Sequence, residues 1–460
     1  MRVVHSTGRS GGWRAATNQT LRGKAIVTKV CRGTFGLALA GGLSVLAVAP
    51  QAQASGFSVP ELSTAGLSTS NAMVANPQEI GAFAYNPAAM AFHDASSLSV
   101  GALLVNMNLS LDNASGSHDS RTPDWVGIPM IQAAVKVSDQ WRVGLGVNTP
   151  FGLETRWDLG TFPLLSGTRT LTVPGIGSLS LPTGNQPTSS QLQVLDITPT
   201  ASYRINELFS VSGGLDYYWA KQAQLDSSLA ELQGRGSGLG WNLGLMFRKD
   251  AWSLGANYHS AATVAIDGTY TPLDTTLVAL GVLTPGQTAK LDLNLPWRLQ
   301  LGARYAINPQ LAVEVDWTRI GWSEFDKIQV KTKNGGAVIF TDTNDWEDTD
   351  AIRLGLTYDV RPTTQLRFGY SYDQTGQTDA HFSARVPDSD RQLFSLGVSQ
   401  GLGQGFKVEA GYMYVLVDDR SYTGDTRYAG LGSDVNGSTA VAGTYEGDVN
   451  LFAIEVSKQF

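Results

Sequence analysis

The feature that most constrains the fold of this chain is a repeated alternation of large apolar residues with small or polar ones. Every second residue is large and apolar in Trp141–Val147 and in Leu239–Phe247. Successive side chains of a β-strand point to opposite faces, so each such segment has one apolar and one polar face. Fourteen segments of this kind begin near Leu98, Trp125, Trp141, Leu192, Phe209, Leu239, Trp252, Pro296, Leu311, Ile352, Leu366, Leu393, Phe406 and Tyr445.

The connections between these segments alternate in length. Short links lie at 137–140, 205–208, 248–252, 307–311, 359–365 and 401–406, and long ones at 111–124, 150–191, 221–238, 260–291, 321–350, 373–391 and 417–444. An even number of antiparallel strands with short turns at one end and long loops at the other is typical of an outer-membrane barrel. A β-sandwich has no reason to sort its loops in this way.

These patterns predict an all-β transmembrane barrel of fourteen antiparallel strands over residues 97–460 in the outer membrane of a Gram-negative bacterium. No run of eighteen apolar residues follows residue 54, so a transmembrane helix is not expected. Tryptophans near strand ends fit the two interfacial girdles of such a barrel: Trp125, Trp141, Trp219, Trp252, Trp297 and Trp317. The last strand ends on Phe460 and must pair with the first, because lipid cannot satisfy an open sheet edge.

The first 54 residues are interpreted as a cleaved export signal. They carry seven basic and no acidic residues, then an apolar stretch, Gly33–Ala49, and an A-x-A site at Ala52–Ala54. An N-terminal membrane anchor is the alternative, but the apolar run is short. The chain has 33 basic and 40 acidic residues, so removing this signal leaves 26 against 40. That balance excludes nucleic acid as a partner, because phosphates need a basic surface.

Residues 55–96 fit no strand pattern and are predicted to be a plug, or hatch, inside the barrel. Gly and Asn-Pro turns separate short helical stretches, and the apolar residues need cover: Phe57, Leu62, Leu67, Met73, Ile80, Phe83, Tyr85, Met90 and Phe92. Fourteen strands enclose a lumen too wide for the wall side chains alone to fill. A periplasmic tail is the alternative, but it would leave these residues in water.

Nothing in the predicted mature chain indicates an enzyme, a metal site or a bound cofactor. The only cysteine, Cys31, lies in the export signal, so thiolate ligands and disulfides are not expected. Gly8–Gly12 matches G-x-S-x-G but lies in the same signal and not on a strand-to-helix elbow. The four remaining histidines have no metal-ligand spacing.

The hatch segment Tyr85–Ala88, just before the first strand, resembles the Asn-Pro-Ala hatch motif of the FadL family of outer-membrane transporters. Four further segments are similar, in the same order along residues 55–460: Gly146–Thr155, Leu293–Trp297, Gly321–Phe325 and Val386–Arg391. The resemblance implies a monomer that carries a hydrophobic small molecule across the outer membrane, with long-chain fatty acids as the favoured substrate. Aromatic or aliphatic hydrocarbons are the alternative substrates, and a general porin is a less favoured alternative function.

The resemblance also implies a gate and a sideways exit into the bilayer. Asn86, Pro87 and Ala88 would fix the hatch, while Phe57 would reach into the ligand pocket. Pro150, Phe151 and Gly152 would form a kink in the third strand that opens the wall, because proline lacks a ladder donor and glycine permits a bend. These three residues could instead begin the loop after that strand.

The predicted partners are the hydrophobic ligand, outer-membrane lipid and, during biogenesis, the barrel assembly machinery. Phe460, an aromatic residue at the end of the last predicted strand, resembles the signal that this machinery recognises. The position of the ligand headgroup is the weakest point of the resemblance. The two basic residues of the fatty-acid transporter align with Asp226 and Asn344, neither of which is basic. Lys221, Arg235, Lys331 or Lys333 could replace them, or the ligand could be a neutral or hydroxylated molecule.

Overall fold

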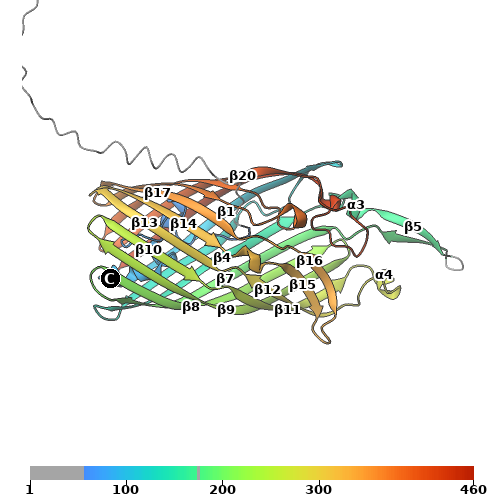
Figure 1. The fold of residues 1–460 in the computed structure, drawn as a ribbon, viewed down its shortest axis with the longest axis horizontal. Helices are drawn as coiled ribbons and strands as arrows, with labels where there is room; N and C mark the ends of the chain where they lie inside the picture. The colour runs from blue at the N-terminus through green and yellow to red at the C-terminus, as the bar shows by residue number, and fades with distance from the viewer. Residues whose placement is uncertain (1–55, 174–176) are drawn as a thin grey trace, which may run out of the picture. The chain divides into compact units, whose positions relative to one another are not determined.

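The computed structural model describes residues 56–173 and 177–460, so the predicted export signal lies outside the described residues. Within them, fourteen strands form one wall (Figure 1). Their bounds are β1 (Ser97–Asn113), β3 (Val126–Lys136), β4 (Trp141–Arg156), β7 (Pro187–Arg204), β8 (Phe209–Ser227), β9 (Ala230–Lys249), β10 (Trp252–His259), β13 (Arg298–Asn308), β14 (Leu311–Ile320), β17 (Thr349–Arg361), β18 (Thr364–Asp373), β19 (Arg391–Gly403), β20 (Phe406–Tyr422) and β21 (Gly443–Gln459).

The wall closes on itself between its first and last strands. Every consecutive pair of these strands is antiparallel, and β21 pairs with β1 from Ser97↔Gln459 to Asp112↔Thr444. A closed barrel leaves no strand edge that lipid would have to satisfy. The predicted fold class and strand number are therefore confirmed for the described chain.

The alternating residues face the two environments that the pattern predicts. Leu98, Val100 and Leu104 of β1 are exposed on the outside, whereas Ser97 and Ser99 are buried toward the lumen. Three aromatic pairs on adjacent strands lie at the end with the short turns, namely Trp141–Tyr203, Phe209–Phe247 and Trp252–Tyr305. These rings suit the membrane–water interface at the periplasmic end. In the described chain no helix is both long and apolar enough to cross a membrane.

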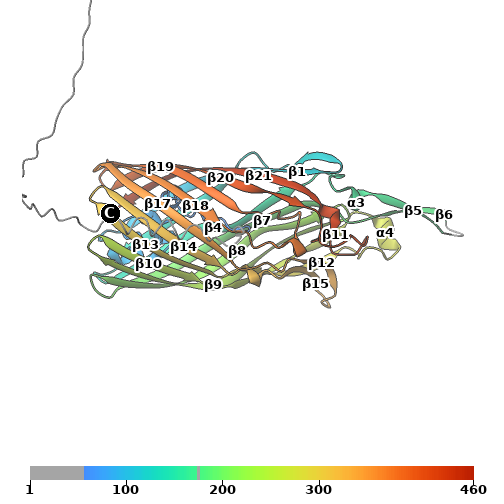
Figure 2. The same cartoon turned by 45° about the horizontal axis from the view of Figure 1, so that its top comes forward.

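Much of the chain predicted to form long loops instead forms strands that extend past the membrane-spanning part of the barrel. β11 (Ala262–Pro272), β12 (Gln287–Leu295), β15 (Lys327–Thr332) and β16 (Val338–Thr343) extend the wall, as does the hairpin partner β2 (Gly116–Asp119). A separate hairpin, β5 (Thr168–Val173) with β6 (Gly177–Pro182), also lies at the barrel end opposite the C-terminus (Figures 1 and 2). In these extensions the buried face is apolar and the exposed face is polar, as with Leu291 and Leu293 against Lys290 and Asp292 of β12, which reverses the pattern of the lipid-facing wall.

Short helices complete the extracellular end and the hatch. At the extracellular end these are α3 (Pro163–Ser166), α4 (Thr275–Ala279), η4 (Trp322–Glu324), η5 (Asp379–His381) and η6 (Thr439–Val441). The hatch contains α2 (Thr64–Leu67), η2 (Ile80–Ala84) and η3 (Pro87–Phe92), which pack against the inner face of the wall. All nine apolar residues that the sequence predicts to need cover here are buried.

Wall side chains bind the hatch backbone, which has little regular structure to satisfy its own N–H groups. Asp316 Oδ2 accepts from the N–H groups of Met73 (2.8 Å) and Val74 (3.0 Å), and Glu314 Oε1 accepts from that of Ala75 (2.7 Å). On the other side of the lumen, the Thr64 N–H donates to Glu455. The hatch is therefore held from several strands at once.

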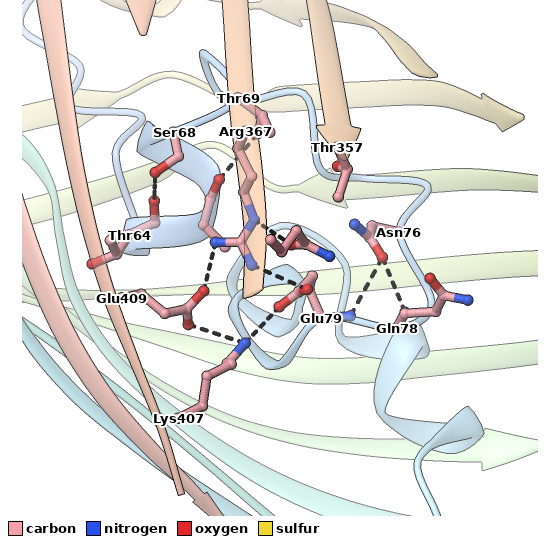
Figure 3. A network of polar contacts seen from close by, with 12 residues as sticks. Thr64, Ser68, Thr69, Asn76, Gln78, Glu79, Thr357, Arg367, Lys407 and Glu409 are labelled. Carbon is pink, nitrogen blue, oxygen red and sulfur yellow. Dashed lines mark hydrogen bonds and ion pairs between the residues drawn. The ribbon is translucent and has the colours of Figure 1, made fainter. Parts of the chain in front are cut away.

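A cluster of four charges joins the hatch to the wall (Figure 3). Glu79 of the hatch forms ion pairs with Arg367 of β18 (3.1 Å) and Lys407 of β20 (2.7 Å). Both cations also contact Glu409 of β20. Two cations and two anions thus balance each other in the lumen, which is the condition under which buried charges are tolerated.

Candidate transport pathway

The strand pairing of the wall is interrupted between β3 and β4. Pairing between these strands runs only from Lys136↔Arg142 to Ile131↔Val147. Above that level, and among the wall strands of the described chain, Val126–Met130 pair only with β1, and 148–156 of β4 pair only with β7. The register of β4 against β7 shifts between Asn148 and Phe151, which marks a bulge.

This interruption, here called the window, is bounded at both ends. Its lower edge is the pair Ile131↔Val147, and its upper edge is the hydrogen bond from Arg121 N to Arg156 O (2.9 Å). Pro129 lies in the part of β3 that does not pair with β4, and Pro150 lies at the bulge of β4. As prolines, neither has a backbone N–H group to donate. Pro150, Phe151 and Gly152 therefore lie inside a strand and not in the loop that follows it.

The N-terminal segment of the hatch binds the free edge of β4. Val59 N donates to Pro150 O (2.8 Å), Gly152 N donates to Phe57 O (3.0 Å), and Ser58 forms an antiparallel bridge with Phe151. Residues 57–59 thus occupy, from the inside, the place on β4 that β3 leaves empty. The structure brings Phe57 and the three residues of the predicted kink into one site.

Phe57 is held by a group of aromatic side chains, here called the aromatic cradle. Its ring lies edge-on to Trp322 (4.7 Å between centroids) and Phe325 (5.2 Å), and close to Trp346 and Phe151 (6.0 Å each). Trp322 and Phe325 lie in the break between β14 and β15, and Trp346 in the break between β16 and β17. Edge-to-face ring pairs contribute about 0.5–1.5 kcal/mol each beyond area burial.

A polar contact holds the residue before Phe57. Gly56 N donates to Asp388 Oδ2 (3.0 Å), while Arg391 donates to Gly56 O (2.6 Å) and pairs with Asp388 Oδ1 (2.6 Å). Asp388 belongs to the segment between β18 and β19. Gly56 has a φ of +62°, a backbone conformation that favours glycine.

A largely apolar cavity of about 270 Å³, here called the upper cavity, lies beside this segment. Val105, Met107 and Leu109 of β1 line it together with Val449 and Leu451 of β21. Val126 and Ile128 on one side of the window, and Gly152 and Leu153 on the other, line it as well. The upper cavity therefore reaches both the window and Gly56–Glu61 of the hatch.

The cations that line the upper cavity in the described chain are already bonded. Arg391 binds Asp388 and Gly56, as given above. Arg420 pairs with Asp379 Oδ1 (2.6 Å) and donates to the backbone oxygens of Asp388 (2.7 Å) and Gln377 (3.0 Å). Acidic residues outnumber these two arginines in the lining: Glu61, Glu154, Asp373, Asp388, Asp418 and Glu446.

The positions aligned with the headgroup residues of the fatty-acid transporter lie near Arg385, which is buried. Arg385 donates to Asp226 O (3.0 Å) and pairs with Asp342 Oδ2 (3.1 Å). Burial raises the pKa of the Asp342 carboxyl to about 6, while the adjacent guanidinium opposes that shift. Asn344 lies next to Asn436 and forms no ion pair.

Asn86, Pro87 and Ala88 form a separate anchor on β7, β8 and β9. Asn86 Nδ2 donates to Val74 O and Leu245 O (2.9 Å each), and its Oδ1 accepts from the Ala88 N–H (3.1 Å). Ser202 Oγ and Ser210 Oγ donate to the backbone oxygens of Pro87 and Ala88. This motif fastens the C-terminal part of the hatch to the wall and does not contact Phe57.

Sequence reasoning missed the cradle and the polar contact at Gly56. The sequence did contain an indication of both, since two of the segments that resemble the family include these residues. Trp322 and Phe325 lie in Gly321–Phe325, and Asp388 and Arg391 lie in Val386–Arg391. Their role became visible only once the fold placed both segments beside Phe57.

A closed, plugged barrel with an apolar cavity and a window in its wall defines an outer-membrane channel for hydrophobic compounds. The family model described as "Outer membrane protein transport protein (OMPP1/FadL/TodX)" matches residues 45–170 and 177–460. The chain belongs to this family, whose members are transport channels and not enzymes, and whose place is the outer membrane of Gram-negative bacteria.

Individual relatives support the same assignment. The long-chain fatty acid transport protein of Salmonella typhi is 23% identical over 417 residues, covering 81% of this chain and 90% of that protein. The crystal structure of a Pseudomonas aeruginosa FadL homologue matches with a TM-score of 0.71 at 19% identity, covering 88% of this chain and 100% of that one. The Pseudomonas putida toluene transporter TodX matches with a TM-score of 0.60 at 18% identity, covering 85% and 98%.

Proposed function

We propose that this protein takes up hydrophobic small molecules from outside the cell and releases them sideways, through the window, into the outer membrane. The observation that carries this proposal is the antiparallel bridge of Ser58 to Phe151, which places the hatch N-terminus on the strand edge left free at the window. One short segment thereby contacts the apolar cavity, the wall opening and the extracellular segment that carries Asp388.

In the proposed sequence of steps, a ligand first enters the upper cavity from the extracellular end. Its binding displaces Gly56–Val59 from the aromatic cradle and from the edge of β4. The window then connects the apolar cavity with the apolar interior of the bilayer. A hydrophobic molecule follows this route because it never has to enter water, in which it dissolves poorly.

Fatty acids and hydrocarbons both have the apolar body that the upper cavity accommodates. The fatty-acid transporter from Salmonella typhi supports the first substrate class, and the toluene transporter from Pseudomonas putida supports the second. A carboxylate headgroup would need a cation, but Arg391 and Arg420 are bonded to other groups. We therefore favour an uncharged hydrophobic ligand over a fatty-acid anion, which reverses the order expected from the resemblance.

We further propose that the protein works as a monomer, because one chain closes the wall and holds its own hatch. Phe460, at the end of β21, is proposed as the contact for the barrel assembly machinery.

A reversible cross-link between the hatch and β4 tests the proposed route. Hydrogen bonds flank Ser58 and Phe151 without joining them directly, so they form the closer type of antiparallel pair, with Cα atoms about 4.5 Å apart. That separation suits a disulfide, and the predicted mature chain has no cysteine to interfere. Ser58→Cys/Phe151→Cys should lose at least tenfold in decane uptake into vesicles when oxidised, and regain it when reduced.

The single variants Ser58→Cys and Phe151→Cys, treated identically, control for the substitutions themselves. They should respond to neither oxidant nor reductant. If the cross-linked protein transports decane as fast as the reduced one, displacement of this segment is not part of the route. The proposed mechanism would then be wrong.

A further inference from the structure

A small chamber of about 40 Å³ lies between the hatch and the wall, and Ser58 lines both this chamber and the upper cavity. Here it is called the lower chamber. Its wall includes Gln132, Asn148, Pro150 and Phe151, so it adjoins the lower edge of the window. Two charged residues line it, namely Asp196 of β7 and Arg298 of β13.

Several polar atoms of the lower chamber have no hydrogen-bond partner within the described chain. They are Asp196 Oδ1, Thr200 Oγ1 and Arg298 Nε. Asp196 is 6% exposed and Thr200 is 7% exposed. Arg298 forms neither a side-chain hydrogen bond nor an ion pair with any described residue. Buried polar groups in proteins are nearly always paired, so unpaired atoms that line one cavity indicate a site for a polar group.

We propose that the lower chamber binds the uncharged hydroxyl end of the hydrophobic ligand. This inference rests on the proposed function, since the apolar body of the same ligand would lie in the upper cavity and the window. The ligand class is therefore a long-chain alcohol or another hydrophobic molecule with a terminal hydroxyl group.

The hydrogen-bonding capacity of the chamber favours a hydroxyl group over other polar ends. A hydroxyl group donates one hydrogen bond and accepts two, so it can serve both Asp196 Oδ1 and Arg298 Nε. A carboxylate can only accept, and would face the Asp196 oxygen without donating to it. An ammonium group can only donate, and would leave the guanidinium unpaired.

The charges around the chamber argue against a ligand anion as well. Asp196 and Asp216 both lie near Arg298, and Asp216 is also held by His259 (3.0 Å) and Asn242 (2.7 Å). A bound carboxylate would bring a third carboxyl group to this buried place, where a further negative charge is costly. The size of the chamber fits this assignment, because about 40 Å³ is enough for a small polar group such as a hydroxyl.

Binding of three matched ten-carbon probes tests the proposal on the whole mature protein. We expect 1-decanol to bind about tenfold more tightly than decane, as one hydrogen bond to a charged group would give. Decanol should also bind more tightly than decanoate. Quenching of the cradle tryptophans Trp322 and Trp346 reports binding at a site shared by all three probes.

Two variants locate the preference for the alcohol. Asp196→Leu/Arg298→Met removes the anion and the cation together, so no unpaired charge remains, and should abolish the preference for decanol over decane. Thr200→Val, which is nearly isosteric, should reduce that preference about threefold. This variant still tests the proposal if the double variant fails to fold. Asp292→Leu, on the exposed face of β12, should change nothing.

The possible failures are distinguishable. If decane binds but decanol binds no better, the chamber holds only water and the hydroxyl site is wrong, while the proposed function stands. The same conclusion follows if decanoate binds as tightly as decanol, or if Thr200→Val and the double variant keep the full preference. If none of the three probes binds, the proposed function itself is contradicted.

Discussion

At the scale of single residues, Phe57 is central to the contacts that hold the hatch segment on β4. It is 4% exposed and contacts four other rings, so its closed position is stabilised by packing on every side. Its neighbours add backbone bonds to Pro150 and Gly152 and a polar contact at Gly56. In the proposed route, a ligand has to overcome the free energy of all these contacts before it can pass.

Phe57→Ala should raise the apparent affinity for decane by at least threefold. Truncating a buried phenylalanine costs roughly 3–5 kcal/mol, which destabilises the closed segment. A ligand that requires the open state then has less free energy to overcome. Titration monitored by tryptophan fluorescence measures the effect, and Phe83→Ala, in a hatch phenylalanine outside the cradle, is the control. A weaker affinity would instead mean that Phe57 itself contacts the bound ligand.

Asp390, just before β19, gives the extracellular end a pH dependence. Burial raises the pKa of this carboxyl to about 6, with Asp418 and Asp388 adding repulsion, while the Tyr372 hydrogen bond and Arg420 oppose the shift. A folded-state pKa above the ordinary value means that protonation favours the folded form. The stabilisation is complete below about pH 4 and is lost as pH rises through about 6.

Asp390→Asn should therefore unfold at a higher temperature than the wild type at pH 8, and at the same temperature at pH 4. Asparagine can still accept the Tyr372 hydrogen bond, so the comparison isolates the charge. Heat-induced mobility shift on gels at the two pH values measures it. An equal difference at both values would show that the carboxyl is not protonated in this range.

At the scale of the elements, the charge cluster between hatch and wall determines how firmly the hatch is docked. Glu79→Gln would leave Arg367 and Lys407 with Glu409 alone, an excess of positive charge in a buried place. Breaking one partner of a buried ion pair costs about 3–5 kcal/mol. Hydrogen exchange in hatch peptides should accelerate while exchange in the wall strands stays the same.

Adding Lys407→Met to Glu79→Gln restores the charge balance and should recover part of the lost protection. Glu446→Gln, an exposed carboxylate on β21, is the matched control and should leave hatch exchange unchanged. If the double variant exchanges faster than the single one, the cluster does not act through charge balance.

The sequence predicted the elements in contact with lipid far better than those beyond it. The fourteen wall strands and six short turns were correct because lipid on one face and a polar lumen on the other impose strict alternation. β11, β12, β15 and β16 were taken for loops, although β11 and β12 also alternate; water meets their outer face, so their apolar residues point inward and their polar residues outward.

The window could not be predicted from β4 alone. Pro150 and Gly152 indicate a bend in β4, but the window depends on how far β3 pairs with β4. The register between two strands cannot be deduced from the sequence of either strand alone. The aromatic cradle could not be predicted from the sequence for a related reason. Trp322 and Trp346 lie in two separate strand breaks, and only the folded wall brings them together around Phe57.

At the scale of the whole molecule, barrel and hatch have separable roles. The wall closes through β1 and β21 without any residue of the hatch. The hatch in turn satisfies lumen charges such as Glu314 and Asp316 through its backbone N–H groups. Without the hatch, water would fill the lumen and hydrate these charges, so they would not be left buried and unpaired.

Deleting residues 56–84 should therefore leave an assembled barrel with a lower unfolding temperature and an open lumen. The truncated protein should still migrate faster on gels before boiling, because its strand pairing is intact. Liposomes that contain it should swell in arabinose, whereas those with the full chain should not, and saturable decane uptake should be lost. The full-length variant Glu79→Gln, with a loosened but present hatch, should leak far less than the deletion.

If the assembled deletion variant leaks no more than the full chain, residues 56–84 do not block the lumen. The passage of small solutes would then be limited by the extracellular segments between 374 and 390 and between 423 and 442, and the hatch would act only as a ligand-binding element.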